Sequence, residues 1–177
     1  VNFPEADIDG VEMWVSWLPN ANWSIEATVG RNDGELSQAQ TLFADTPGAI
    51  PVPVGTELPI VPDVKRHLKV MYQLPRTLLG GEPYIMLRYT YTGESVNSLA
   101  GIESISFSPP VVQQGSWRTL DIQAGVETDA WSASLYVDNV TDENGELFFN
   151  NRFAQQRLTV NQPRSFGFNF RYNLGGK

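Results

Sequence analysis

The sequence contains no cysteine and a single histidine, His67, among its 177 residues. The absence of cysteine excludes disulfide frameworks, thiolate metal sites and cysteine nucleophiles. One histidine without a paired carboxylate nearby is poor evidence for a metal centre or a catalytic base. The serine, aspartate, glutamate and arginine residues form no set of nucleophile, base and orienting group. We therefore expect no enzymatic activity, no cofactor and no bound metal.

Positive charge and long apolar runs are also scarce. Twelve Lys and Arg residues stand against 20 Asp and Glu, for a net charge of −8. A nucleic-acid surface is therefore not expected, because phosphate contacts need clustered cations. No stretch approaches the roughly 18 to 20 apolar residues of a membrane-spanning helix, which excludes a helical membrane protein. A membrane β-barrel is not excluded, because only every second residue of its strands faces lipid.

The chain starts at Val1, without an initiator methionine, a charged leader or an apolar signal core. We expect either that a signal has been removed or that the sequence is a piece of a longer protein.

Apolar and polar residues alternate with a period of two, and helical periodicity is nearly absent. The alternating segments are residues 11–17, 23–30, 67–74, 85–91, 119–126, 131–138 and 165–174. This pattern predicts seven strands, each with one apolar and one polar face. These segments of 7 to 10 residues are longer than soluble strands, which average nearer five or six, and approach the roughly 9 to 11 residues that a tilted strand needs to cross a bilayer.

Short and long connections alternate between these segments. The short connections lie around residues 19–22, 79–83 and 127–129 and are rich in turn-forming residues. The long connections span residues 37–63, 95–116 and 142–162. Soluble domains seldom carry three structureless loops of such length. Outer-membrane barrels have this layout, with tight turns in the periplasm and long loops outside.

Five large aromatic residues are predicted to lie on the apolar face near the short turns. They are Trp17, Trp23, Tyr72, Trp131 and Tyr172. Amphipathic rings prefer the level of the lipid headgroups, so membrane barrels carry aromatic girdles there. The alternative is that these rings are core residues of a soluble β-sandwich.

Residues 131–142 read WSASLYVDNVTD, and residues 163–172 read PRSFGFNFRY. These two motifs resemble the penultimate and the final barrel strands of TonB-dependent outer-membrane transporters. The Gly-Val-Glu at residues 10–12 resembles the start of one of the later strands. The Leu-Pro-x-x-Pro at residues 58–62 resembles the segment leading into the next strand. The likeness runs through nearly the whole chain in the family's order.

The resemblance implies an all-β fold, an antiparallel up-and-down meander of about seven long strands. Residues 1–177 would form the C-terminal portion of a transmembrane β-barrel that has 22 strands in the family, without the plug domain. The two edge strands of such a portion would not pair with each other. The function implied is outer-membrane uptake of a scarce solute, such as siderophore-bound iron, cobalamin or an oligosaccharide. The implied partners are outer-membrane lipid, the energy-coupling TonB complex, the plug domain and the solute.

Candidate site residues follow from this arrangement. The residues predicted to face the barrel lumen are Glu26, Lys69, Arg88, Asp121 and Arg171, with His67 and Asn169 on the same side. The residues predicted on the convex, lipid-directed face include Leu68, Leu87, Ile122, Leu135 and Phe168. The candidate ligand contacts in the outer loops are Phe107, Trp117, Phe148 and Phe149, because exposed aromatic rings can stack on a solute. These rings could equally pack the loops together.

Two other functions remain open at this stage. One is a small self-contained outer-membrane barrel that acts as an adhesin, an anchor or an enzyme. Such barrels have an even number of strands and at least eight, whereas seven are predicted here. The other is a soluble carbohydrate-binding β-sandwich, which would purify without detergent.

Overall fold

Every regular element of the described chain is a β-strand. The computed structural model describes residues 5–42, 47, 49–99, 111–150 and 157–174. Its long strands are β1 (Ala6–Asn20), β2 (Trp23–Leu36), β5 (Val64–Gln73), β6 (Glu82–Thr92), β9 (Trp117–Glu127), β10 (Trp131–Asp138) and β13 (Ser165–Tyr172). Within this described part, no helix is long and apolar enough to cross a membrane.

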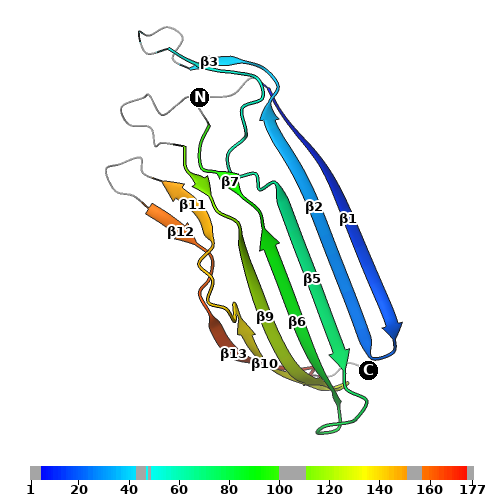
Figure 1. The fold of residues 1–177 in the computed structure, drawn as a ribbon. Coiled ribbons are helices and arrows are strands. Elements are labelled where there is room, and N and C mark those ends of the chain that lie inside the picture. The colour runs from blue at the N-terminus through cyan, green and yellow to red at the C-terminus, as the bar shows by residue number, and fades with distance from the viewer. Residues whose placement is uncertain (1–4, 43–46, 48, 100–110, 151–156, 175–177) are drawn as a thin grey trace.

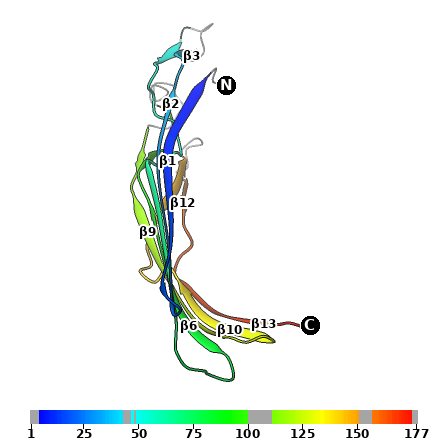
Figure 2. The same ribbon diagram turned by 90° about the vertical axis from the view of Figure 1, so that its right-hand side faces the viewer.

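The long strands form one antiparallel meander in sequence order, β1-β2-β5-β6-β9-β10-β13 (Figure 1). The predicted all-β fold class and the seven strands are thereby confirmed. In the described residues β1 pairs only with β2 and β13 only with β10, so the sheet is open with two edges, as expected. Figure 2 shows that the sheet is strongly curved, with the lower ends of β10 and β13 bending away from the other strands.

Two details of the sequence-based prediction were wrong. The first two strands extend past residues 11 and 30, to Ala6 and Leu36, because polar residues there hide the alternation while the backbone pairing continues. The long connections are also not structureless. Each contains a two-stranded ribbon, formed by β3 (Gln40–Leu42) with β4 (Ile50–Val52), β7 (Ser95–Val96) with β8 (Gln113–Gln114), and β11 (Glu146–Asn150) with β12 (Arg157–Val160). These strands of two to five residues are too short to give a periodic signal.

The register places all seven alternations on the same two faces. One cross-strand row runs through every strand of the sheet and is apolar throughout: Trp17, Ile25, Val70, Leu87, Ile122, Val137 and Phe166. The neighbouring row on the opposite face contains Glu26, Lys69, Arg88 and Asp121. The prediction of one shared apolar face is therefore confirmed.

The apolar face of the sheet is largely exposed in the described chain. Leu135 is 66% exposed and Phe168 is 61% exposed, whereas Ser134 on the polar face is only 7% exposed. The buried hydrophobic cluster lies instead among the long connections, where Leu36, Ile50, Val52 and Leu99 pack with Leu58. Monomeric soluble proteins rarely expose an apolar patch of this extent. The sheet therefore exposes its apolar side chains, whereas a soluble β-sandwich would bury them in its core.

Two tyrosines on the polar face lie over glycines of the neighbouring strand. Tyr136 pairs with Gly167, and a Cβ atom at Gly167 would come within 2.4 Å of the Tyr136 hydroxyl oxygen. Tyr84 pairs with Gly125, and its hydroxyl accepts a hydrogen bond of 2.8 Å from Gln123. An aromatic ring that covers a strand glycine shields the bare backbone beneath it. Gly167 thus provides room for a large neighbour, which the structure identifies as Tyr136.

Gly167→Ala is expected to destabilise the sheet by about 1 to 3 kcal/mol, because the new methyl group overlaps the Tyr136 ring. Adding Tyr136→Ala should remove most of that clash, so the two changes should be non-additive in a double-mutant cycle measured by urea unfolding. Gly30→Ala is the matched control, since a Cβ there would meet no atom within 4 Å. Equal losses at the two glycines would contradict the proposed packing.

Candidate functional site

A ladder of charged side chains crosses the polar face of the sheet. Lys69 Nζ lies 3.3 Å from Glu26 Oε1 on the neighbouring strand. Arg88 lies directly opposite Lys69, and its guanidinium binds Asp121 at 3.6 Å and Asp138 at 3.2 Å. All five side chains are partly exposed, at 21% to 40%, so each pair alone contributes little to stability. Arg88 nevertheless connects three strands, because it reaches from β6 across β9 to β10.

Asn139 joins this ladder to the connection that follows β10. It is 3% exposed and adopts a left-handed backbone conformation, with φ of 49°. Its Nδ2 donates to the carbonyl oxygens of Glu143 and Gln162 at 2.9 and 3.0 Å, and its Oδ1 accepts from the Glu143 N–H at 3.0 Å. Its own N–H donates to Asp121 Oδ1 at 2.9 Å. One buried asparagine therefore fixes both ends of the third long connection.

Asp142 and Arg164 close the same connection beside the sheet. Asp142 Oδ1 accepts the Arg164 N–H at 2.9 Å, and the Arg164 guanidinium lies 3.7 Å from Asp142 Oδ2. Arg164 Nη1 also donates to the Val140 carbonyl oxygen at 3.4 Å. The Asn-x-Thr-Asp and Pro-Arg motifs, which are more than twenty residues apart in the sequence, are thus structural partners. They hold the end of β10 against the start of β13.

A polar hollow of about 450 Å³ lies between the charged ladder and the long connections. Its lining includes Arg88 and Asp121 from the ladder, Asn139, and His67 and Trp117 from the ends of β5 and β9. His67 Nδ1 lies 3.3 Å from the Thr90 hydroxyl. Among the described residues there is no group of three or more histidines and carboxylates that could hold a metal ion. The hollow offers charged and hydroxyl groups for binding, and it shows no catalytic arrangement.

The three long connections are bonded to one another above this hollow. The first is joined to the second by backbone bonds, from the Ile60 N–H to the Val96 carbonyl at 2.9 Å and from the Asp63 N–H to the Glu94 carbonyl at 3.2 Å. The second is joined to the third where Asn97 and Gln114 donate, both at 3.4 Å, to carbonyl oxygens of the β11 strand. These connections therefore form one continuous wall at the end of the sheet, and they include the only large hydrophobic cluster of the described chain.

The predicted lumen residues share one face of the sheet. Glu26, Lys69, Arg88 and Asp121 form the ladder, whereas Arg171 lies near the short turns, opposite Ser132. That this shared face lines a barrel lumen remains a prediction.

The three described aromatics that were predicted to contact a ligand are all half-buried. Trp117 is half-buried and lies over Gly145, at which a Cβ would approach its ring to 2.4 Å. Phe148 and Phe149 are half-buried in β11 and pair with Thr159 and Leu158. Phe107 lies outside the described residues. Contact of these rings with a ligand remains a prediction.

The five predicted girdle aromatics all lie on the apolar face. Trp23 and Tyr72 are cross-strand partners with ring centroids 4.6 Å apart, and Trp131 pairs with Tyr172. Trp17 lies on β1, opposite Ile25. All five lie at the end of the sheet that carries the short turns. A girdle at a membrane surface remains part of the proposal below.

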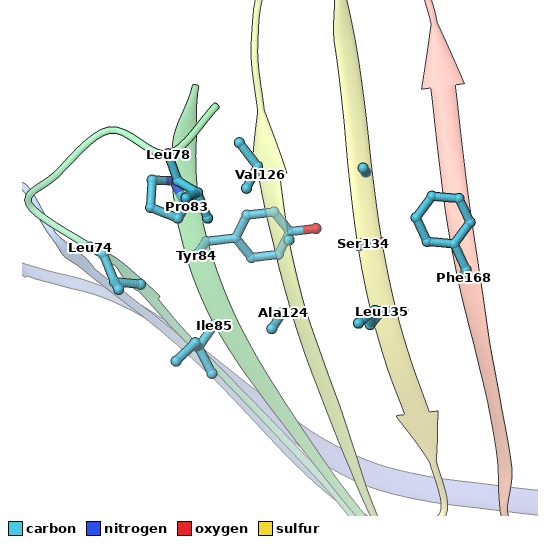
Figure 3. Close-up of a pocket in the computed structure, with 12 residues that line it drawn as sticks. Leu74, Leu78, Pro83, Tyr84, Ile85, Ala124, Val126, Ser134, Leu135 and Phe168 are labelled. Carbon is cyan, nitrogen blue, oxygen red and sulfur yellow. The ribbon is translucent and has the colours of Figure 1, made fainter. Parts of the chain in front are cut away.

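A second hollow, of about 330 Å³, lies on the apolar face near the short turns (Figure 3). It forms because Ala124 leaves a depression between the larger side chains of Ile85, Leu135 and Phe168. Leu74 and Leu78 border it from the turn before β6. Figure 3 also shows Tyr84 extending across β9 toward Ser134. This apolar depression is separate from the polar hollow, which lies on the other face.

Sequence reasoning did not identify Asp138, Asn161 and Gln162 as parts of the site. Asp138 could have been predicted, because the alternation of faces along β10 places it on the same polar face as Arg88, two strands away. Asn161 and Gln162 had no such signal, since their positions depend on how the third long connection folds back to Gly145 and Asn139.

No protein-family model and no curated protein matches the sequence. Solved structures that share the fold include two receptors. The ferric yersiniabactin uptake receptor FyuA from Yersinia pestis superposes with a TM-score of 0.71 and 22% identity, over 96% of this chain and 24% of that receptor. The siderophore receptor PiuA from Acinetobacter baumannii gives a TM-score of 0.69 and 17% identity, over 93% of this chain and 21% of that receptor. The chain thus spans less than a quarter of the receptors that it matches.

These similarities agree with the sheet order, the exposed apolar face and the alternation of short and long connections. The chain has the fold of a portion of the TonB-dependent receptor β-barrel.

Proposed function

We propose that the chain is the C-terminal part of the barrel of a TonB-dependent receptor, which takes up a scarce small solute through the outer membrane of a Gram-negative bacterium. The observation that carries this proposal is the wide apolar face that no part of the described chain covers. Lipid is the medium in which such a face is stable, and only closed barrels and helices satisfy their backbone groups there.

The slope of the aromatic girdle supports a tilted, membrane-spanning sheet. The cross-strand row that starts at Trp17 reaches β13 at Phe166, whereas the girdle residue of β13 is Tyr172, six residues nearer the turns. At about 3.3 Å per residue this drift is roughly 20 Å along the strands, over six strand spacings that together measure roughly 29 Å. A level girdle then requires a strand tilt of about 35°, which agrees with the roughly 35 to 45° of outer-membrane barrels.

The height of the apolar band agrees with the same placement. Eight residues separate Trp23 from Arg31 on β2, and eight separate Tyr172 from Arg164 at β13. Eight residues rise roughly 26 Å along a strand, or roughly 22 Å along the membrane normal at this tilt. Outer-membrane barrels have an apolar band of about 25 Å.

The polar hollow below the long connections is the part of the chain that we propose to face the transported solute and the plug. Ferric siderophores are the solute class we favour, because both structural neighbours are siderophore receptors. Cobalamin and oligosaccharides are the alternatives. The proposal also requires the plug domain and the energy-coupling TonB complex as partners.

The proposal is tested with the complete protein that carries this chain, expressed in a Gram-negative strain lacking its own siderophore receptors. We expect the protein in the outer-membrane fraction. We also expect uptake of radiolabelled iron supplied with at least one of a catecholate, a hydroxamate or a phenolate siderophore, and loss of that uptake when a protonophore collapses the energy supply. Recovery of the protein in the soluble fraction would contradict membrane insertion. An inserted protein that imports none of these chelates would contradict the solute class.

A further inference from the structure

Three arginines lie on the apolar face immediately beyond the apolar band, at the end that carries the long connections. They are Arg31 on β2, Arg66 on β5 and Arg118 on β9. Arg66 pairs with Tyr91, and Tyr91 pairs with Arg118, so two arginines flank one tyrosine. The Arg66 guanidinium lies 5.2 Å from the centre of the Tyr91 ring. All three arginines are exposed.

The three arginines also lie at one depth. Arg31 is two residues farther from the turns than the row that contains Arg66 and Arg118. The tilt of about 35° moves a level line by about one residue per strand, so the three Cα atoms would lie within roughly 3 Å of one plane parallel to the membrane. This plane is the headgroup level on the side of the long connections.

None of the three guanidinium groups is neutralised by the described protein. No Asp or Glu carboxylate in the described residues lies within 4.0 Å of them, although the chain carries an excess of acids. Arg164, just before β13, follows the same alternation of faces but is bound to Asp142. Asp9 and Asp33 lie on the same face as Arg31, two residues farther out, and are cross-strand partners of each other. These three exposed arginines beside an apolar surface therefore have N–H donors that no described carboxylate occupies.

We propose that Arg31, Arg66 and Arg118, with Tyr91, form a docking surface for the phosphate groups of lipids in the leaflet on the side of the long connections. A guanidinium binds phosphate through paired N–H donors, and the apolar band below accepts the acyl chains of the same lipid. The inference rests on the proposed membrane placement but not on transport.

The test uses the complete protein in phosphatidylcholine nanodiscs, into which phosphatidic acid is titrated while retained lipid is measured by native mass spectrometry. Removing two interfacial cations should weaken binding of phosphatidic acid by about thirtyfold, so we expect that loss for Arg66→Gln with Arg118→Gln. Arg76→Gln is the matched control, because Arg76 is exposed in the turn at the opposite end and should leave binding unchanged. The Arg66→Lys, Arg118→Lys variant should show an intermediate affinity, because it keeps the charge and loses the paired donors.

Equal retention of phosphatidic acid by the wild-type protein and the double glutamine variant would overturn the proposal, as would an equal loss in Arg76→Gln. Displacement of the lipid by millimolar inorganic phosphate would show a site for free anions and would also overturn it. A protein that does not enter nanodiscs at all would refute the membrane placement, which separates that failure from a failure of the lipid site.

Discussion

In the complete protein that carries this chain, Leu135→Arg is expected to lower the free energy of folding into lipid vesicles by about 3 kcal/mol. Leu135 is 66% exposed on the apolar face and pairs with Phe168, which lies midway between Tyr172 and Arg164, the two limits of the apolar band at β13. An arginine at the bilayer midplane on the lipid side of a barrel costs about 2 to 4 kcal/mol. Urea titration of the vesicle-inserted protein, followed by tryptophan fluorescence, measures the change.

The control for this change must lie on the other face at the same depth. Ser134 is unsuitable because it is 7% exposed and close to Gly125, so a large side chain there would clash. Asn169 pairs with Ser134, lies on the polar face of β13 and is exposed. Asn169→Arg should therefore change the folding free energy by less than about 1 kcal/mol, as is usual for exposed polar positions. A larger loss for Asn169→Arg than for Leu135→Arg would mean that the polar face contacts lipid.

Asn139→Ala should destabilise the folded barrel by about 2 to 4 kcal/mol. The substitution removes three side-chain hydrogen bonds and leaves the Glu143 N–H and two carbonyl oxygens without their partner in a buried site. Each buried polar group left unpaired costs about 1 to 3 kcal/mol. Alanine also tolerates the left-handed conformation at φ 49° less well than asparagine does.

Two further variants separate the causes of that loss. Asn139→Gly removes the backbone strain but not the lost hydrogen bonds, so it should recover only a minor part of the stability. Asn144→Ala is the control, because Asn144 is an exposed residue in the same connection and should be nearly neutral. Full recovery in Asn139→Gly would show that the hydrogen bonds contribute little. All variants are compared by the same urea titration.

The strands could be predicted because alternation is a local property of the sequence. Residues 131–138 were predicted with the bounds that the structure gives to β10, and the connections 37–63 and 95–116 are close to those observed. The extension of β2 to Leu36 could not be predicted, because the residues from Arg31 to Asp33 are all polar and show no alternation. Its pairing depends on β1, which continues in register to Ala6.

The candidate site was predictable in part for the same reason. The alternation of polar and apolar positions alone places Glu26, Lys69, Arg88 and Asp121 on one face, and the register of the strands makes them neighbours. The bond between Arg164 and Asp142, and the position of Asn161 near Gly145, depend on how a connection of more than twenty residues returns to the sheet. Sequence patterns carry no such long-range information.

The bonds between the long connections have a consequence for how the outer end of the sheet could move. Ile60 and Asp63 donate to the second connection, and Asn97 and Gln114 donate to the third. Displacing the described part of the second connection therefore breaks bonds to both of its neighbours. A movement of this part is thus coupled to the first connection on one side and to the third on the other.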